Sequence, residues 1–298
     1  MSFLPFALLF SIISTSVFCQ EKQEDKETEA TKKTALTTIT IDRSKIDITA
    51  PVSLQSLQKD DINHYIDEKY IVPLLAGPDD FITLIHPNMA PNNKGVAILL
   101  PDWHQSATTP KSINFLRQSL PEQGWTTITI LPPSKPDNFP SRALKKSQRT
   151  EEDKKTRETY LSSLSLLMKA VMEKARSYPG MVMVITEGNH AGFLMSLYQQ
   201  DKNTAPSAFI TLSSYMLTAS ANKQYNQNLA DSDFPVLDLL LTKDHSQVLS
   251  NAAQRRALAE QALKPHYRQR KINNLTPSYY PQQDLLININ GWLKSIGY

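Results

Sequence analysis

The sequence predicts an α/β fold in a single domain, with one mostly parallel sheet that carries helices on both of its faces. Two observations support this prediction. Five continuous apolar runs are typical of strands that are covered on both faces. Segments whose apolar residues recur at helical spacing separate these runs. No internal repeat is visible, so a repeat architecture is not expected.

The expected strands lie in order along the chain. "DDFITLIHP" (79–87) alternates apolar and polar residues, which is typical of a half-buried antiparallel strand. The buried strands are expected in "GVAILLP" (95–101), "TTITILPP" (126–133), "MVMVIT" (181–186), "AFITLSS" (208–214) and "VLDLLLTKD" (236–244). "YRQRKINNL" (267–275) is the expected last strand, and "LTTITIDRSKIDI" (36–48) is a further candidate strand.

The clearest helices are predicted between and after these strands. They are "SINFLRQSLPEQGW" (112–125), "YLSSLSLLMKAVMEKARSYPG" (160–180), "SNAAQRRALAEQALK" (250–264) and "QDLLININGWLKSI" (283–296). A polar stretch near 134–155 has no apolar period, and we interpret it as an insertion or a lid over the sheet edge.

The first residues differ from the rest of the chain. Residues 1–19 are apolar and uncharged, so they predict a secretory signal peptide that is cut near Cys19, with export to the periplasm. An uncleaved membrane anchor is the alternative. Residues 20–38 are dense in charge and predict a disordered linker, which leaves 39–298 as the folded domain. Because Cys19 is the only cysteine, internal disulfides and cysteine chemistry are excluded.

The composition argues against several partners. A net charge of +3 on 298 residues is weak, so no nucleic acid is expected. The basic run Lys264 to Lys271 is most simply a solvated face. No stable membrane span is expected in the mature protein. No cofactor is predicted, and the spacing of histidines and acids matches no known metal motif.

One short motif resembles part of a catalytic site. The apolar run 181–185 leads into a frame from Gly188 to Gly192, and a helical pattern follows. This arrangement resembles the nucleophile elbow Gly-x-Ser-x-Gly, with His190 in the place of the serine.

Five short segments of the sequence together resemble a known family. They are "GVAILLPDWHQS", "LRQSLPEQGWTTITILPP", "VMVITEGNHAG", "PVLDLLLTKD" and "NGWL". They are similar to an uncharacterised family of exported bacterial proteins with an α/β-hydrolase-like fold, domain of unknown function 3530. The resemblance implies an α/β-hydrolase-like sheet. It implies no reaction, because the family has none that is settled.

An active hydrolase of this fold needs an oxyanion loop, a nucleophile, an acid and a histidine in that order. Asp244, at the end of a predicted strand, lies where the acid belongs. The candidate oxyanion loop, 101–106, lacks the usual glycine. No histidine follows His266, so the catalytic base is missing. Two of the three triad positions therefore depart from the pattern.

Other groups at the predicted strand ends leave alternatives open. The carboxyl ends of parallel strands converge on one crevice. The side chains expected there, besides Asp244, are Asp102, Trp103, His104, Glu187, Asn189, His190 and His245. The acids and histidines among them, together with Asp244, suit local hydrogen bonds and helix caps, or a divalent metal held by nitrogen and oxygen ligands. Ser213 and Ser214 are candidates for a displaced nucleophile.

Three hypotheses for function follow. The first is a non-catalytic protein, a pseudo-hydrolase, that binds a small ligand or another protein of the bacterial envelope. The second is an esterase or acyl hydrolase with a rearranged site. The third is metal-assisted hydrolysis that uses His104, His190 and Asp244.

Overall fold

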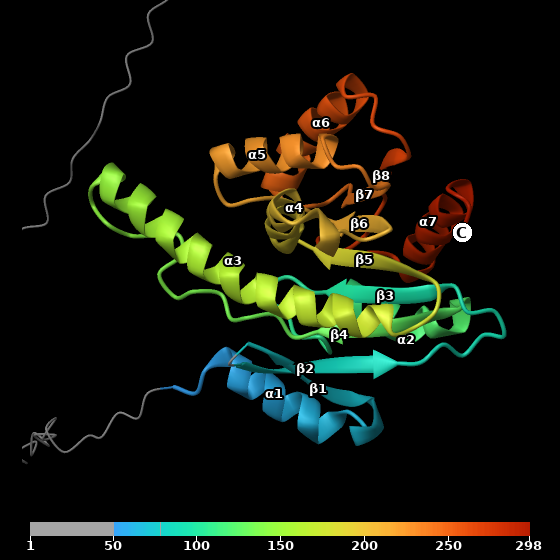
Figure 1. The fold of residues 1–298 in the computed structure, drawn as a ribbon. Coiled ribbons are helices and arrows are strands. Elements are labelled where there is room, and N and C mark those ends of the chain that lie inside the picture. The colour runs from blue at the N-terminus through green and yellow to red at the C-terminus, as the bar shows by residue number, and fades with distance from the viewer. Residues whose placement is uncertain (1–50, 78) are drawn as a thin grey trace, which may run out of the picture. The chain divides into compact units, whose positions relative to one another are not determined.

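A computed structural model describes residues 51–77 and 79–298. Its centre is an eight-stranded sheet in the order β1-β2-β4-β3-β5-β6-β7-β8 (Figure 1). The strands are β1 (Ile71–Ala76), β2 (Asp79–His86), β3 (Gly95–Leu100), β4 (Trp125–Ile130), β5 (Met181–Glu187), β6 (Ala208–Leu212), β7 (Val236–Leu241) and β8 (Tyr267–Ile272). The α-helices are α1 (Leu54–Tyr65), α2 (Ser112–Ser119), α3 (Lys146–Arg176), α4 (His190–Gln200), α5 (Ala219–Ala230), α6 (Ser246–Gln261) and α7 (Gln282–Ser295).

The pairing of the strands confirms the predicted fold class. Strands β3 to β8 are all parallel to one another, whereas β2 runs antiparallel to both β1 and β4. The antiparallel strand predicted at 79–87 is therefore confirmed. The chain crosses from β4 to β5 over β3, so the strand order reverses between β3 and β5. In open α/β sheets, ligands bind at the carboxyl ends of the strands at such a reversal.

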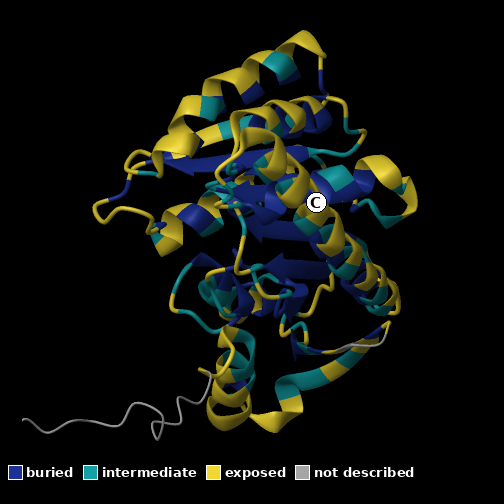
Figure 2. Ribbon diagram, turned by 90° about the vertical axis from the view of Figure 1, so that its left-hand side faces the viewer, coloured by how far each residue is buried: buried dark blue, intermediate teal, exposed yellow. Residues whose placement is uncertain are grey.

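Helices bury both faces of the sheet. One face packs against α3, α4 and α5, and the other packs against α2 and α7. The apolar residues of the last helix, α7, form its inner side: Leu285, Ile289, Trp292 and Leu293 are all buried. Figure 2 shows the buried strands in dark blue and the exposed outer sides of the helices in yellow. The apolar runs therefore form strands because both of their sides are covered.

The structure differs from the sequence prediction in the first half of α3. This helix begins at Lys146, so much of the stretch predicted as an insertion is helical. The first buried residue of the helix is Tyr160. Nine of the fourteen residues at 146–159 are Lys, Arg, Gln or Glu, which are good helix formers, but the segment has no apolar face. Hydrophobic periodicity cannot detect a helix of this kind, because it is polar on all sides.

Other differences lie at the start of the described region. Helix α1 and strand β1 were not predicted from the sequence. The predicted signal peptide, the linker and the candidate strand at 36–48 lie outside the described residues. Within the described ranges, no helix combines the length and the apolar character that crossing a membrane requires.

Candidate functional site

The turn between β5 and α4 lies at the reversal of strand order. Strand β5 ends at Glu187 and α4 begins at His190, so only two residues make the turn. Gly188 has a φ of 61°, in the left-handed region that glycine adopts without strain. A nucleophile elbow holds its nucleophile on this sharp turn. The sequence motif from Gly188 to Gly192 predicts that His190 occupies this turn. In the structure, Gly188 occupies the turn, and His190 is the first residue of helix α4.

Asp102, in the loop after β3, fills the space in front of this turn. A Cβ atom at Gly188 would lie 2.6 Å from both Cγ and Oδ1 of Asp102. The same Oδ1 accepts a hydrogen bond of 3.1 Å from the backbone N–H of Asn189. In α/β hydrolases, the N–H of the residue after the nucleophile helps to stabilise the oxyanion. Here an aspartate side chain already occupies the corresponding donor.

His190 is completely buried, and both of its ring nitrogens have partners. Nδ1 lies 2.6 Å from the carbonyl oxygen of Pro101, and Nε2 lies 2.6 Å from the hydroxyl of Tyr160. A carbonyl oxygen only accepts, so we assign the proton to Nδ1, and Nε2 then accepts from Tyr160. Burial lowers the pKa of His190, although the nearby Asp102 raises it in part. The arrangement suits a neutral imidazole that is held in place.

Aromatic rings surround this imidazole. The rings of Trp103 and Phe193 lie with their centroids 6.1 and 6.2 Å from that of His190, and Trp103 also packs on Tyr160. Trp103 is itself buried. Two of the predicted crevice residues, Trp103 and His190, are therefore brought together, but as parts of a packed aromatic cluster.

Glu187, at the end of β5, is the other unusual group of this region. Its Oε1 accepts from Nε2 of Gln105 at 3.1 Å, whereas Oε2 has no partner among the described residues. Burial raises the pKa of Glu187 to about 7, and the neighbouring Asp102 adds to this effect while Gln105 opposes it. The carboxyl group therefore titrates near neutral pH.

Asp244 lies three residues after the end of β7, at the carboxyl edge of the sheet. Its Oδ2 accepts from the Ser213 hydroxyl at 2.6 Å and from the Leu241 backbone N–H at 2.9 Å. The hydroxyl of Tyr280 lies 2.8 Å from Oγ of Ser213. Ser213 has a φ of 48°, which is uncommon for a residue other than glycine. Among the described residues, the Asp244 carboxylate thus forms a hydrogen bond with a serine hydroxyl and with no imidazole ring.

The two remaining histidines of the predicted crevice are exposed. His245 caps α6 through Nδ1, which accepts from the backbone of Gln247, and its ring stacks on Tyr215 at 4.6 Å. His104 lies in the loop after β3, next to Trp103. Among the residues that the structure describes, no three histidine, cysteine, aspartate or glutamate side chains form a group suited to a metal ion.

Sequence reasoning missed two tyrosines of this region, Tyr160 and Tyr280. Both are buried, and they contact His190 and Ser213 respectively. Tyr280 lies in the loop after β8, where the missing histidine was sought. No local signal marks either residue, because each contact joins segments 30 or more residues apart.

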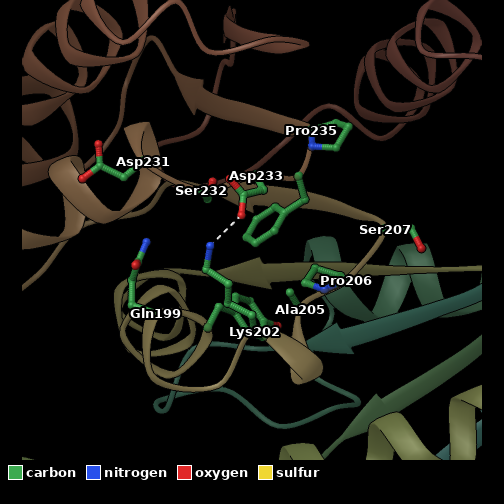
Figure 3. Close-up of a pocket in the computed structure, with 11 residues that line it drawn as sticks. Gln199, Lys202, Ala205, Pro206, Ser207, Asp231, Ser232, Asp233 and Pro235 are labelled. Atoms are coloured by element: carbon green, nitrogen blue, oxygen red, sulfur yellow. Dashed lines mark hydrogen bonds and ion pairs between the residues drawn. The ribbon is translucent and has the colours of Figure 1, made fainter.

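Two cavities flank the sheet at opposite ends of its strands. A cavity of about 250 Å³ lies beside the turn, and Asn189 and Phe193 form part of its wall. Another, of about 350 Å³, lies where the chain enters β6 and β7, with Pro206 and Pro235 in its wall (Figure 3). An exposed ion pair of 2.8 Å between Lys202 and Asp233 borders it. The second cavity is at the amino ends of the strands, away from the predicted crevice.

Solved structures of hydrolases share the fold. Est1E from Butyrivibrio proteoclasticus has a TM-score of 0.54 at 10% identity, over 76% of this chain and 99% of its own. A dienelactone hydrolase from Anabaena variabilis has a TM-score of 0.53 at 14% identity, over 76% and 96%. An alpha-beta serine hydrolase homologue from Coxiella burnetii has 0.50 at 10% identity, over 78% and 100%. At these identities the similarity concerns the fold alone.

Sequence comparison identifies the family but no characterised relative. No curated protein matches the chain. The model of one family, described as proteins of unknown function (DUF3530), matches residues 2–295. Since this match covers nearly the whole chain, the protein belongs to the DUF3530 family and has its α/β-hydrolase-like fold.

Proposed function

We propose that this protein is a non-catalytic α/β-hydrolase-like protein whose strand-end site binds a ligand. One observation carries the proposal. The turn position that would hold a nucleophile is Gly188, and the carboxylate of Asp102 occupies the space that its side chain would need. A negative charge at that point also opposes a developing oxyanion, because like charges in a poorly solvated site repel strongly.

The position of the catalytic base supports the same proposal. In a serine triad, the histidine removes the hydroxyl proton and the acid orients the histidine. After β8 this chain offers Tyr280, and no histidine follows His266. His190 is not a substitute base, since both of its nitrogens are already engaged by Pro101 and Tyr160.

An esterase assay tests the proposal. We expect the purified protein to release nitrophenol from para-nitrophenyl acetate and butyrate no faster than a heat-denatured sample. His190→Ser should remain equally inactive, because it supplies a hydroxyl without a base. A complete triad is about four orders of magnitude faster than one that lacks a member, so this assay would easily detect a complete one. Turnover above the denatured control that saturates with substrate would contradict the proposal.

A second candidate function is an acyl hydrolase with a displaced nucleophile, and Ser213 is the observation that favours it. Its strained backbone and its hydrogen bond to Asp244 place a hydroxyl next to a carboxylate at the strand ends. A fluorophosphonate probe distinguishes the two candidates. Labelling that Ser213→Ala abolishes would favour the hydrolase, and no labelling at the concentration that saturates a control esterase would favour the binding protein.

We also propose that the protein is exported to the periplasm. The apolar, uncharged residues 1–19 support this proposal. The ligand would then be a small molecule or an envelope protein. Intact-mass measurement of protein from an osmotic-shock fraction tests the location, and recovery only from membranes with residues 1–19 attached would contradict it.

A further inference from the structure

We propose that the cavity beside Asn189 binds a small organic acid whose single-ring apolar body carries a hydroxyl group opposite the carboxylate. The inference rests on the proposed binding role and specifies the ligand class. The cavity lies between the first half of α3, the start of α4 and the segment that joins β6 to α5. In Figure 1, the arrowhead of β5 and the first turns of α3 both lie toward the left-hand end of the strands.

Asn189 supplies the polar group at the inner wall. Only 1% of the residue is exposed, and neither the Oδ1 nor the Nδ2 atom of its side chain has a hydrogen-bond partner among the described residues. Tyr215 lies nearby. Burial raises the pKa of its hydroxyl, and the proximity of the Asn189 amide lowers that pKa in part. The Tyr215 hydroxyl and the Asn189 amide nevertheless do not meet the distance and angle of a hydrogen bond. A buried amide without partners is costly, so a ligand that satisfies it gains affinity.

A hydroxyl group suits this amide better than a charged group. The amide offers both a donor and an acceptor, and a hydroxyl can donate to Oδ1 or accept from Nδ2. A carboxylate is less suitable at this depth, because Asp102 already places a negative charge on the backbone N–H of the same residue. The ligand therefore presents a neutral polar group to Asn189.

The middle of the cavity is apolar. Phe139, Phe193, Met216 and Leu217 contribute to its wall. The Met216 side chain can pack here because residue 192 is a glycine: a Cβ at Gly192 would collide with the methionine side chain. The volume of the cavity is about 250 Å³. Two phenylalanines and a methionine favour an aromatic ring, and the volume accommodates one ring with a short side chain.

The outer wall is cationic. Lys154 and Arg157 lie three residues apart on α3, and both border the cavity. Neither forms an ion pair among the described residues. The one acid on this wall, Asp153, accepts a 2.6 Å hydrogen bond from the backbone N–H of Ser141. Two cations against one engaged carboxylate attract an anionic group to the rim.

The wild-type protein allows a first test with three matched ligands. They are para-hydroxyphenylpropionate, phenylpropionate, which lacks the hydroxyl, and para-propylphenol, which lacks the carboxylate. We expect the first to bind with a Kd on the order of 0.1 mM, as its size allows, by titration calorimetry. Loss of the hydroxyl should weaken binding about tenfold. Loss of the carboxylate should weaken it about threefold, and this difference should shrink at high salt.

Variants assign these differences to residues. Asn189→Ala should remove the tenfold preference for the hydroxyl and leave the preference for the carboxylate. Arg157→Ala should remove the threefold preference for the carboxylate and leave the preference for the hydroxyl. Lys155→Ala is the matched control, because it removes the same charge from the same helix at an exposed position that does not border the cavity. It should bind all three ligands as the wild type does.

The outcomes separate this inference from the proposed function. If none of the three ligands binds at millimolar concentration, or if the hydroxyl makes no difference to wild-type affinity, the ligand class is wrong. The absence of esterase activity would be unaffected by that result. Equal effects of Lys155→Ala and Arg157→Ala would also refute the assignment. Esterase turnover with normal binding would instead refute the non-catalytic role while the cavity assignment stands.

Discussion

Replacing Gly188 tests the geometry on which the proposed function depends. In Gly188→Ala the new Cβ would lie 2.6 Å from Oδ1 of Asp102, and the backbone would keep a φ of 61°. The left-handed conformation costs about 1–2 kcal/mol in a residue with a Cβ. Displacing Asp102 breaks its bond to the buried N–H of Asn189, which costs about 1–3 kcal/mol more. The variant should lose about 2–5 kcal/mol of its free energy of unfolding.

A double-mutant cycle separates these two contributions. Asp102→Ala alone loses the bond to Asn189 and should cost about 1–3 kcal/mol. In the double variant Gly188→Ala with Asp102→Ala, the new Cβ no longer collides with the carboxylate. The hydrogen bond between residue 102 and Asn189, which each single variant loses, is then counted only once. The double variant should therefore be about 2 kcal/mol more stable than the two single losses predict, which is far beyond the usual additivity error of about 0.5 kcal/mol.

Urea unfolding followed by tryptophan fluorescence measures all four proteins. Gly291→Ala in α7 is the control, because a Cβ there meets nothing within 4 Å and its φ is not in the left-handed region. It should stabilise the protein by about 0.5–1 kcal/mol, since alanine favours a helix interior. Additive effects at 188 and 102, within about 0.5 kcal/mol, would show that Asp102 does not fill the nucleophile space.

Two further predictions concern buried charges. The raised pKa of Glu187, about 7 against its ordinary 4.5, means that the folded state keeps a proton that the unfolded state has lost between these pH values. Stability should therefore fall as pH rises from about 4.5 to about 7, by up to about 3 kcal/mol. Urea midpoints at pH 5 and 8 check this, and Glu187→Gln should reduce the slope; an unchanged slope would contradict it. Arg255→Ala should cost about 3–5 kcal/mol, because it leaves the fully buried Asp238 without its 2.9 Å ion pair. Asp238→Leu combined with Arg255→Leu should recover much of this loss in urea unfolding, and full additivity of the two changes would oppose that explanation.

The sequence alone determined the order and type of most elements of the sheet. The apolar runs at 95–101, 181–186 and 236–244 form buried parallel strands, because a strand covered on both faces needs apolar side chains on both sides. The alternating run at 79–87 forms the antiparallel strand β2. These signals are local, so they are visible in a single segment. The polar first half of α3 has no such signal, and only its good helix formers would have indicated it.

The tertiary structure decided what the strand ends hold. The glycines at 188 and 192 indicated a tight turn, but not which residue sits at its sharpest point; the backbone conformation assigned that position to Gly188. Asp102 meets the N–H of Asn189 across 87 residues of sequence, and Tyr160 meets His190 across 30. Such contacts depend on how loops and helices pack at the end of the sheet. Hydrophobic periodicity reports which side of an element is buried, and it carries no information about which polar groups will meet there.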